Sequence, residues 1–245
     1  MRASYCVTCL ADQFFAEAAM DAVRLLESLG IRVEFPADQT CCGQPAFNAG
    51  FHDQARQMAR HTLQVFSGKQ PVILPSGSCS TMLKAHYAEL FSGPELEGAW
   101  DLAARSFELS QFLCEVLGCP RLGDGLRGKR VAYHPGCHGL RELGIGDGPK
   151  RLLEAAGATV VPWEAELECC GFGGLFAVKL PEVSVGMADR KLDTLPEVDV
   201  LTSGDPGCLL QLAGRLRVRG NPLPVRHLAS LLWEARSGRR DSDVR

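Results

Sequence analysis

The sequence Cys41-Cys42-Gly43 occurs twice in this chain of 245 residues and returns in the second half as Cys169-Cys170-Gly171. Each copy lies between an earlier and a later cysteine at nearly the same distances. The spacing is C-x31-CCG-x35-C in the first half and C-x31-CCG-x36-C in the second. The flanking cysteines are Cys9 and Cys79 in the first half, and Cys137 and Cys208 in the second. Eight of the eleven cysteines thus share one duplicated pattern, which indicates two structural repeats.

The hydrophobic pattern predicts the same order of strands and helices in both halves. In the first half it predicts strands at residues 2–5, 31–35 and 71–75 and helices at 12–29, 52–66 and 79–91. In the second half it predicts strands at 131–133, 159–162 and 198–202 and helices at 148–156, 181–194 and from 208 onward. Alternating strands and helices favour a parallel sheet with right-handed crossovers. The predicted fold is α/β, with two tandem repeats related by pseudo-twofold symmetry, each a small parallel sheet flanked by helices.

The chain divides into four predicted segments. The first repeat covers residues 1–91, a connector with one helix covers 92–129, the second repeat covers 130–236, and a disordered tail covers 237–245. Cys114 and Cys119 lie in the connector, outside the repeated pattern, and we expect them to be buried small apolar side chains.

Composition excludes several classes of protein. A net charge of −3 argues against a nucleic-acid partner, which usually requires a basic surface. No apolar run approaches the roughly 20 residues that span a bilayer, and the first residues lack the apolar core of a signal peptide. We therefore expect a cytoplasmic protein without a direct membrane span. In that reducing compartment, eleven cysteines indicate metal binding or redox chemistry rather than a disulfide framework.

Each cysteine position in the pattern follows the carboxyl end of a predicted strand. Open parallel sheets bind their ligands at that edge, so cysteines far apart in the sequence can converge there. We expect two sets of four metal-ligating thiols, one in each repeat. The first set is Cys9, Cys41, Cys42 and Cys79, and the second is Cys137, Cys169, Cys170 and Cys208.

Four thiolates match the four ligands of an iron–sulfur cluster such as [4Fe–4S]. Adjacent cysteines can serve two iron atoms, whereas a single zinc ion more often takes a local C-x2-4-C pair. Gly43 and Gly171 would let the backbone approach a cluster with positive φ. Zinc, a redox-active pair of thiols and buried structural thiols stay open as alternatives.

Three further side chains lie beside the predicted ligands. Cys6 forms a local C-x-x-C pair with Cys9, and its equivalent in the second half is His134. His138 directly follows Cys137. Each of the three is an additional ligand candidate or a hydrogen-bond donor next to the ligands.

The spacing and the local sequences resemble those of the CCG or cysteine-rich domain family. This family includes heterodisulfide reductase, the glycolate oxidase iron–sulfur subunit and the lactate utilization protein A group. The chain is most similar to the last group, because it has two repeats and little else. The matching local sequences are Pro75-Ser76-Gly77-Ser78-Cys79 and His134-Pro135-Gly136-Cys137-His138.

The resemblance implies a cytoplasmic iron–sulfur subunit that supports oxidation of L-lactate to pyruvate. It also implies two partners, a ferredoxin-like iron–sulfur protein and a third small subunit. One departure matters, because heterodisulfide reductases end each motif in C-x-x-C and hold clusters with five cysteines. Met82 and Gln211 occupy that last position here, so four-cysteine sites are expected. Competing hypotheses are direct thiol- or cluster-based catalysis and a zinc-stabilised scaffold.

Charge predicts a difference between the two sites. Glu164, Glu166 and Glu168 precede the second pair, whereas only Asp38 occupies the matching stretch of the first half. Because negative charge disfavours adding an electron, we expect the lower reduction potential at the second site.

Overall fold

A computed structural model describes residues 1–238 and contains two four-stranded sheets whose neighbouring strands are all parallel. The first sheet has the order β2-β1-β3-β4, and the second has the matching order β6-β5-β7-β8. The strands of the first sheet are β1 (Arg2–Tyr5), β2 (Arg32–Glu34), β3 (Val72–Leu74) and β4 (Ser106–Glu108). Those of the second are β5 (Arg130–His134), β6 (Thr159–Val160), β7 (Val200–Ser203) and β8 (Val225–His227). The predicted α/β fold with two tandem repeats is confirmed.

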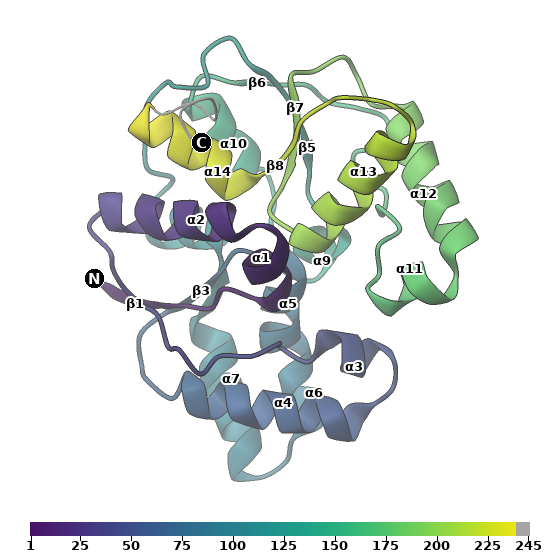
Figure 1. The fold of residues 1–245 in the computed structure, drawn as a ribbon. Coiled ribbons are helices and arrows are strands. Elements are labelled where there is room, and N and C mark those ends of the chain that lie inside the picture. Colours follow the sequence, from purple (N-terminus) through teal and green to yellow (C-terminus); the bar gives the residue numbers. More distant parts are fainter. Residues whose placement is uncertain (239–245) are drawn as a thin grey trace.

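Helices connect successive strands in both halves (Figure 1). The first half contains α1 (Cys9–Phe14), α2 (Ala16–Ser28), α3 (Gln44–Asn48), α4 (His52–Val65), α5 (Gly77–Thr81), the π-helical turn η1 (Met82–His86), α6 (Tyr87–Leu90), α7 (Pro94–Arg105), α8 (Leu109–Gln111) and the π-helical turn η2 (Phe112–Val116). The second half contains α9 (Cys137–Arg141), α10 (Gly148–Ala155), α11 (Leu175–Lys179), α12 (Pro181–Asp193), α13 (Pro206–Val218) and α14 (Leu228–Ser237).

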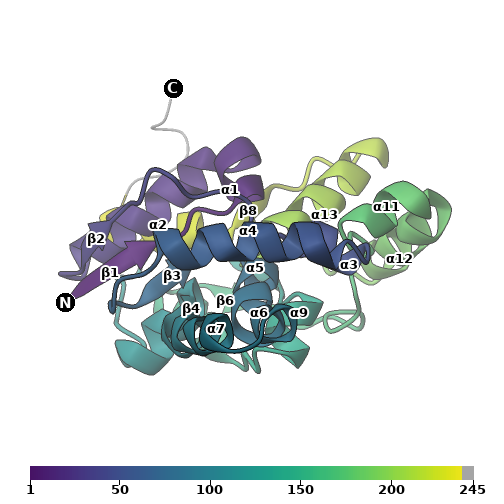
Figure 2. The ribbon, with the colours of Figure 1, turned by 90° about the horizontal axis from the view of Figure 1, so that it is seen from below.

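The inner strands β1, β3, β5 and β7 are short and largely buried on both faces, which is the usual situation of a parallel sheet. Successive side chains of β3 point to opposite faces, so Ile73 joins a central core while Val72 and Leu74 join an outer core of the first half. Figure 2 shows α2 and α7 on opposite sides of β1 and β3. Side chains alternate in the same way in the second sheet, where Val200 of β7 lies in the central core and Leu201 lies in an outer core of the second half.

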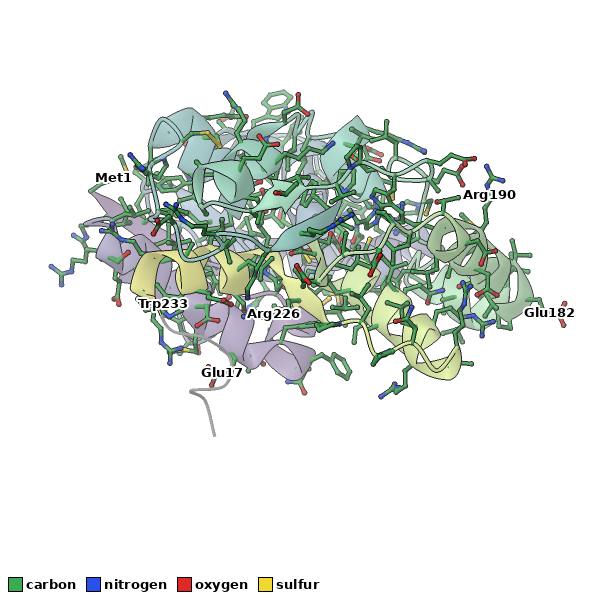
Figure 3. The ribbon with its side chains drawn as sticks, turned by 90° about the horizontal axis from the view of Figure 1, so that it is seen from above. Met1, Glu17, Glu182, Arg190, Arg226 and Trp233 are labelled. Atoms are coloured by element: carbon green, nitrogen blue, oxygen red, sulfur yellow. A yellow bond between two sulfur atoms is a disulfide. The ribbon has the colours of Figure 1, made fainter. Side chains whose placement is uncertain are left out.

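The central core belongs to both repeats. It combines Leu25 and Leu26 of α2 with Leu231 and Leu232 of α14, although the two helices lie near opposite ends of the chain. Figures 1 and 3 show α14 lying along α2, with the labelled Trp233 and Glu17 on the same side of the molecule. The two repeats therefore bury a common apolar layer, and neither half can complete its core alone.

The structure changes several expectations about chain organisation. Part of the expected connector, residues 92–129, forms α7 and β4, and β4 pairs with β3, so this part belongs to the first sheet. The sequence predictions also missed β8, which precedes the final helix. No helix was predicted directly after Gly43, but α3 begins there, because a proline is well tolerated in the first helical turn.

The ends of the predicted helices also differ. The helix predicted over residues 12–29 is broken at Phe15 into α1 and α2. Helix α14 continues to Ser237, the first residue of the expected disordered tail. Residues 239–245 of that tail lie outside the described residues.

Cys114 and Cys119 form a disulfide, which corrects the expectation of two independent buried thiols. They are five residues apart, with Cys114 in the middle of η2 and Cys119 in the bend that follows it. The bend brings their Cα atoms to 4.0 Å, and the remaining nine cysteines are free. Among the described residues, no helix is both long enough and apolar enough to cross a membrane.

The shared core predicts that both repeats unfold together. Leu231 is fully buried, so Leu231→Ala should lower the free energy of unfolding by about 2–5 kcal/mol. Val218→Ala is the matched control, because Val218 is 73% exposed and its truncation should change stability by less than about 0.5 kcal/mol. Chemical denaturation followed by circular dichroism should show one transition for both variants. Separate transitions for the two halves would contradict a shared core.

Candidate metal centre

All eight cysteines of the duplicated pattern line a single cavity of about 420 Å³. They come from the loops and helix starts that follow the carboxyl ends of β1, β2 and β3 in the first half and of β5, β6 and β7 in the second. The sequence predicted a convergence within each repeat. The structure adds that the two sets of four thiols face the same space, because the two sheets meet at these edges.

The four thiols of the first repeat form two close pairs. The Sγ atoms of Cys9 and Cys41 are 3.7 Å apart, and those of Cys42 and Cys79 are 3.4 Å apart. Cys42 and Cys79 are buried, whereas Cys9 and Cys41 are partly exposed toward the cavity. The second repeat has the same division, with Cys170 and Cys208 buried and Cys137 and Cys169 partly exposed.

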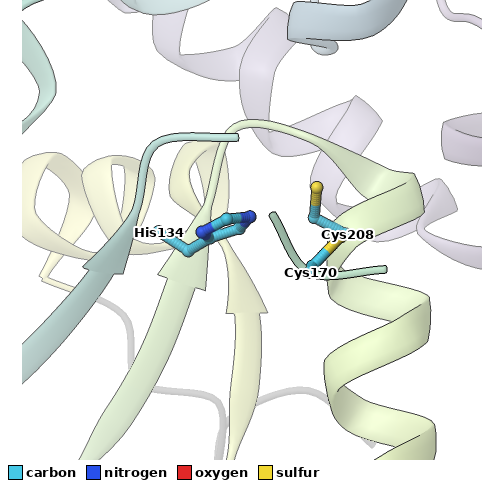
Figure 4. Close-up of side chains that lie close together, drawn as sticks. All are labelled: His134, Cys170 and Cys208. Atoms are coloured by element: carbon cyan, nitrogen blue, oxygen red, sulfur yellow. The ribbon is translucent and has the colours of Figure 1, made fainter. Parts of the chain in front are cut away.

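His134 adds a nitrogen donor to the second site. One of its ring nitrogens and the Sγ atoms of Cys170 and Cys208 all lie within 4.8 Å of one another. Figure 4 shows the imidazole at the end of β5 turned toward these two sulfur atoms. Burial lowers the pKa of His134 to about 3, so the ring is neutral at pH 7 and has a free electron pair.

The glycine after each cysteine pair has the positive φ that the sequence predicts, 87° at Gly43 and 83° at Gly171. A second pair of equivalent positions precedes the first cysteine of each set. Thr8 has φ 67° and ψ 144°, and Gly136 has φ 72° and ψ 142°. This conformation is almost restricted to glycine, so Thr8 maintains a strained backbone directly before Cys9.

Asp205 makes hydrogen bonds to the first turns of α5 and α13, the helices that carry Cys79 and Cys208. Its Oδ1 accepts a hydrogen bond from the backbone N–H of Gly207, which caps α13 just before Cys208. Its Oδ2 accepts from the backbone N–H of Ser78 in the other repeat, at 2.7 Å, next to Cys79. Gly77 and Gly139 lie where the repeats approach each other, and a Cβ at Gly77 would make an ordinary contact with the Gly139 backbone at 3.5 Å.

His227 makes a second connection between the repeats. Its Nδ1 accepts from the backbone N–H of Ala229, so its Nε2–H donates to the carbonyl of Pro75, at 3.0 Å. Pro75 lies at the end of β3, shortly before Cys79. The segment from Pro75 to Ser78, which leads to Cys79, is therefore hydrogen-bonded at both ends by side chains of the second repeat, His227 and Asp205.

Hydrogen bonds among the thiols give each site two acceptors, which are Cys41 and Cys79 in the first site and Cys169 and Cys208 in the second. Hydrogen bonds from Cys42 and Cys9 lower the pKa of Cys41 to about 3. Cys169 has its pKa lowered in the same way by Cys137 and Cys170. Hydrogen bonding to Cys41 and burial raise the pKa of Cys9, and the same causes raise that of Cys42. Binding a metal at such a site must displace the remaining thiol protons.

The expected excess of negative charge at the second site is largely neutralised. Glu166 pairs with Lys150, and Glu168 pairs with Arg190. In addition, the buried ammonium of Lys191 donates to the backbone carbonyls of Ala165, Glu166 and Glu168. These contacts remove the basis for predicting the lower potential at the second site.

The spacing of the donor atoms differs between the two sites. A tetrahedral zinc with Zn–S bonds of about 2.3 Å needs its four sulfur atoms about 3.8 Å from one another. Among residues 1–238, the ligand atoms of His134, Cys170 and Cys208 form the one group of three that lie within 4.8 Å of one another. No three sulfur atoms of the first site come this close together among the described residues. Four thiols around an open cavity can instead serve several iron atoms.

Four other residues that the sequence analysis singled out also have defined surroundings in the structure: Met82, Gln211, Cys6 and His138. Met82 is buried in the outer core of the first half, and Gln211 donates to the hydroxyl of Ser184, so neither replaces a fifth thiolate. Cys6 is buried, and its pKa is raised by burial and by the neighbouring Cys79. His138 lines the cavity and hydrogen-bonds Glu142.

Sequence reasoning missed Asp205, Thr8 and Lys191. An aspartate directly before Pro206-Gly207 is a recognisable helix N-cap, so its capping role could have been predicted, although not its bond to the other repeat. Thr8 carries no local signal of positive φ. Lys191 lies on an amphipathic helix where lysine usually faces solvent, and its burial depends on the loop that packs over it.

Comparison with known proteins agrees with the duplicated pattern. The sequence matches the cysteine-rich CCG domain over residues 3–84 and again over 131–213. The chain belongs to the CCG cysteine-rich domain family. Each match contains one complete set of four cysteines, so this chain contains the domain twice.

Full-length relatives in the family are close in sequence. The chain is 44% identical over 237 residues to lactate utilization protein A of Geobacillus kaustophilus, covering 95% of this chain and 98% of the relative. It is 42% identical over 243 residues to the protein of the same name from Oceanobacillus iheyensis, covering 97% and 99%. Among solved structures, a hypothetical protein from Helicobacter pylori has the same fold, with a TM-score of 0.64, 10% identity and coverage of 99% of this chain and 50% of that one.

The two glycines after the cysteine pairs should differ in their tolerance of a side chain. A Cβ at Gly171 would lie 2.5 Å from the carbonyl oxygen of Ser184, whereas a Cβ at Gly43 would meet the Met58 side chain at 3.3 Å. Gly43→Ala should therefore cost about 1–2 kcal/mol from its positive φ alone, and Gly171→Ala should cost more. Denaturant unfolding of the two variants measures this difference. Equal losses of stability would contradict the close approach at Gly171.

Proposed function

We propose that this chain is a cytoplasmic iron–sulfur electron-transfer subunit of an L-lactate or other 2-hydroxy acid oxidation system. Each repeat would hold one cluster, most simply [4Fe–4S], on its four cysteines. The relatives named lactate utilization protein A support the lactate system. The partners we propose are a ferredoxin-like iron–sulfur subunit and a third small subunit.

One observation carries the proposal: two sets of four free thiols, one from each repeat, line one cavity. A bound iron–sulfur cluster would supply one-electron redox chemistry. The protein's own residues keep the thiols in place, since Asp205 fixes the starts of both cysteine-bearing helices. Two redox sites on one cavity, held by a rigid shared core, suit the passage of electrons between partners.

Direct catalysis in this chain is the second candidate function. The cavity of about 420 Å³ falls in the size range of small-molecule sites, so a substrate could reach the cysteines that line it. A zinc-stabilised scaffold is the remaining alternative. It draws support from the compact group of His134, Cys170 and Cys208, which a single ion could bind together.

Metal analysis separates these functions. Protein purified without oxygen should contain iron and acid-labile sulfide in two cluster equivalents. Cys42→Ser and Cys170→Ser should each remove about half of the iron and one of two EPR signals. Cys114→Ser is the matched control, because Cys114 is disulfide-bonded outside the cavity and its loss should leave both signals. Stoichiometric zinc without sulfide would overturn the electron-transfer proposal.

Reduction assays distinguish a relay from direct catalysis. The isolated, iron-loaded chain should not be reduced by L-lactate, and reduction should require the partner subunits. Reduction of the isolated chain by lactate would instead assign the reaction to the cavity itself.

A further inference from the structure

His134 is a buried side chain that the four-cysteine description leaves unexplained. It is 1% exposed, and neither ring nitrogen makes a hydrogen bond of normal geometry within the described chain. Buried polar atoms almost always have a partner, so an imidazole with two unpaired nitrogens indicates a missing ligand.

The position of His134 places it among the cysteines of the second site. It ends β5, whereas Cys170 lies in the loop after β6 and Cys208 lies in the first turn of α13. The ligand atoms of the three residues lie within 4.8 Å of one another, and all three side chains are buried (Figure 4). A strand end, a loop and a helix start thus bring one nitrogen and two buried sulfur atoms together, next to the partly exposed Cys137 and Cys169.

The second nitrogen of the ring also has a suitable neighbour. The backbone of Glu166 lies near the ring, although it makes no hydrogen bond with His134 in this structure. Histidines that bind metals usually donate their other N–H to a backbone carbonyl or carboxylate, which fixes the ring's orientation. His134 therefore has metal-binding neighbours and a candidate acceptor for its second N–H.

The equivalent position in the first repeat has different chemistry. Cys6 occupies the place of His134 in the duplicated spacing, is also buried, and is close enough to Cys79 for their charges to interact. The fold therefore places a fifth donor beside the buried pair of each site. This donor is a sulfur in the first repeat and a nitrogen in the second.

We propose that His134 is a ligand of the second cluster, binding iron through a ring nitrogen beside Cys170 and Cys208. This inference rests on the proposed iron–sulfur function. A neutral imidazole in place of an anionic thiolate raises the reduction potential of a cluster, as the Rieske centres show. A histidine ligand at this position therefore gives the second cluster a higher potential than a cysteine at the same position would, and Lys191 nearby acts in the same direction.

Pulsed EPR tests the nitrogen ligand directly. The chain is prepared with ordinary histidine and with histidine labelled by ¹⁵N in the ring, then reduced with dithionite. We expect a strong nitrogen hyperfine coupling that changes to the ¹⁵N pattern with the label. A cluster signal without ring-nitrogen coupling would overturn the inference and leave the iron–sulfur function intact. Zinc in place of iron would overturn both.

Two variants identify the histidine and measure its effect. His134→Cys should abolish the coupling and lower the second cluster's reduction equilibrium constant more than tenfold, or about 59 mV for one electron. His138→Gln is the matched control, because His138 is also a neighbour of Cys137 but hydrogen-bonds Glu142. Loss of the coupling in His138→Gln, or an unchanged potential in His134→Cys, would overturn the assignment. The labelled wild-type protein provides a result even if a variant fails to fold.

Discussion

The carboxylate of Asp205 is the interaction on which the arrangement of the site depends. Its two oxygen atoms accept backbone hydrogen bonds at the starts of α13 and α5, which carry Cys208 and Cys79 in different repeats. Hydrogen bonds to an ionised acceptor are among the stronger ones in proteins, and this carboxylate is buried. It therefore ties the two cysteine sets together at the place where the carboxyl edges of both sheets meet.

A duplicated domain can place its two sites far apart, but here the shared core brings them together. Helix α14 of the second half packs on α2 of the first, and the central apolar layer includes residues of both sheets. This packing orients the repeats so that both sets of thiols open into one cavity. Stability and the arrangement of the site thus depend on the same interface, because a change that separates the repeats would also separate the two sets of thiols.

Much of the fold could be predicted from the sequence because its signals are local. Strands and helices follow hydrophobic periodicity, and the repeated Cys-Cys-Gly spacing identifies the four thiols of each half. Strand β4 was missed because three residues between two helices carry little periodic signal. The disulfide of Cys114 and Cys119, the burial of His134 and the common cavity depend on how the chain packs in three dimensions, which no local pattern encodes.

The two sites are similar in backbone but different in chemistry. Thr8 and Gly136 have nearly the same dihedral angles, and Gly43 and Gly171 also match, so the fold requires the same turns twice. The side chains around these turns have diverged, with Cys6 and Tyr87 near the first pair and His134 and Lys191 near the second. This difference suits two clusters of unequal potential.

The central claim is that two separate metal clusters share one cavity, each held by the cysteines of one repeat. Anomalous X-ray diffraction at the iron edge, from crystals of the full chain grown without oxygen, tests it most directly. Two distinct iron peaks are predicted, one surrounded by Cys9, Cys41, Cys42 and Cys79 and the other by Cys137, Cys169, Cys170 and Cys208, with His134 beside the second. A single peak bound by cysteines of both repeats, or anomalous signal only at the zinc edge, would contradict the claim.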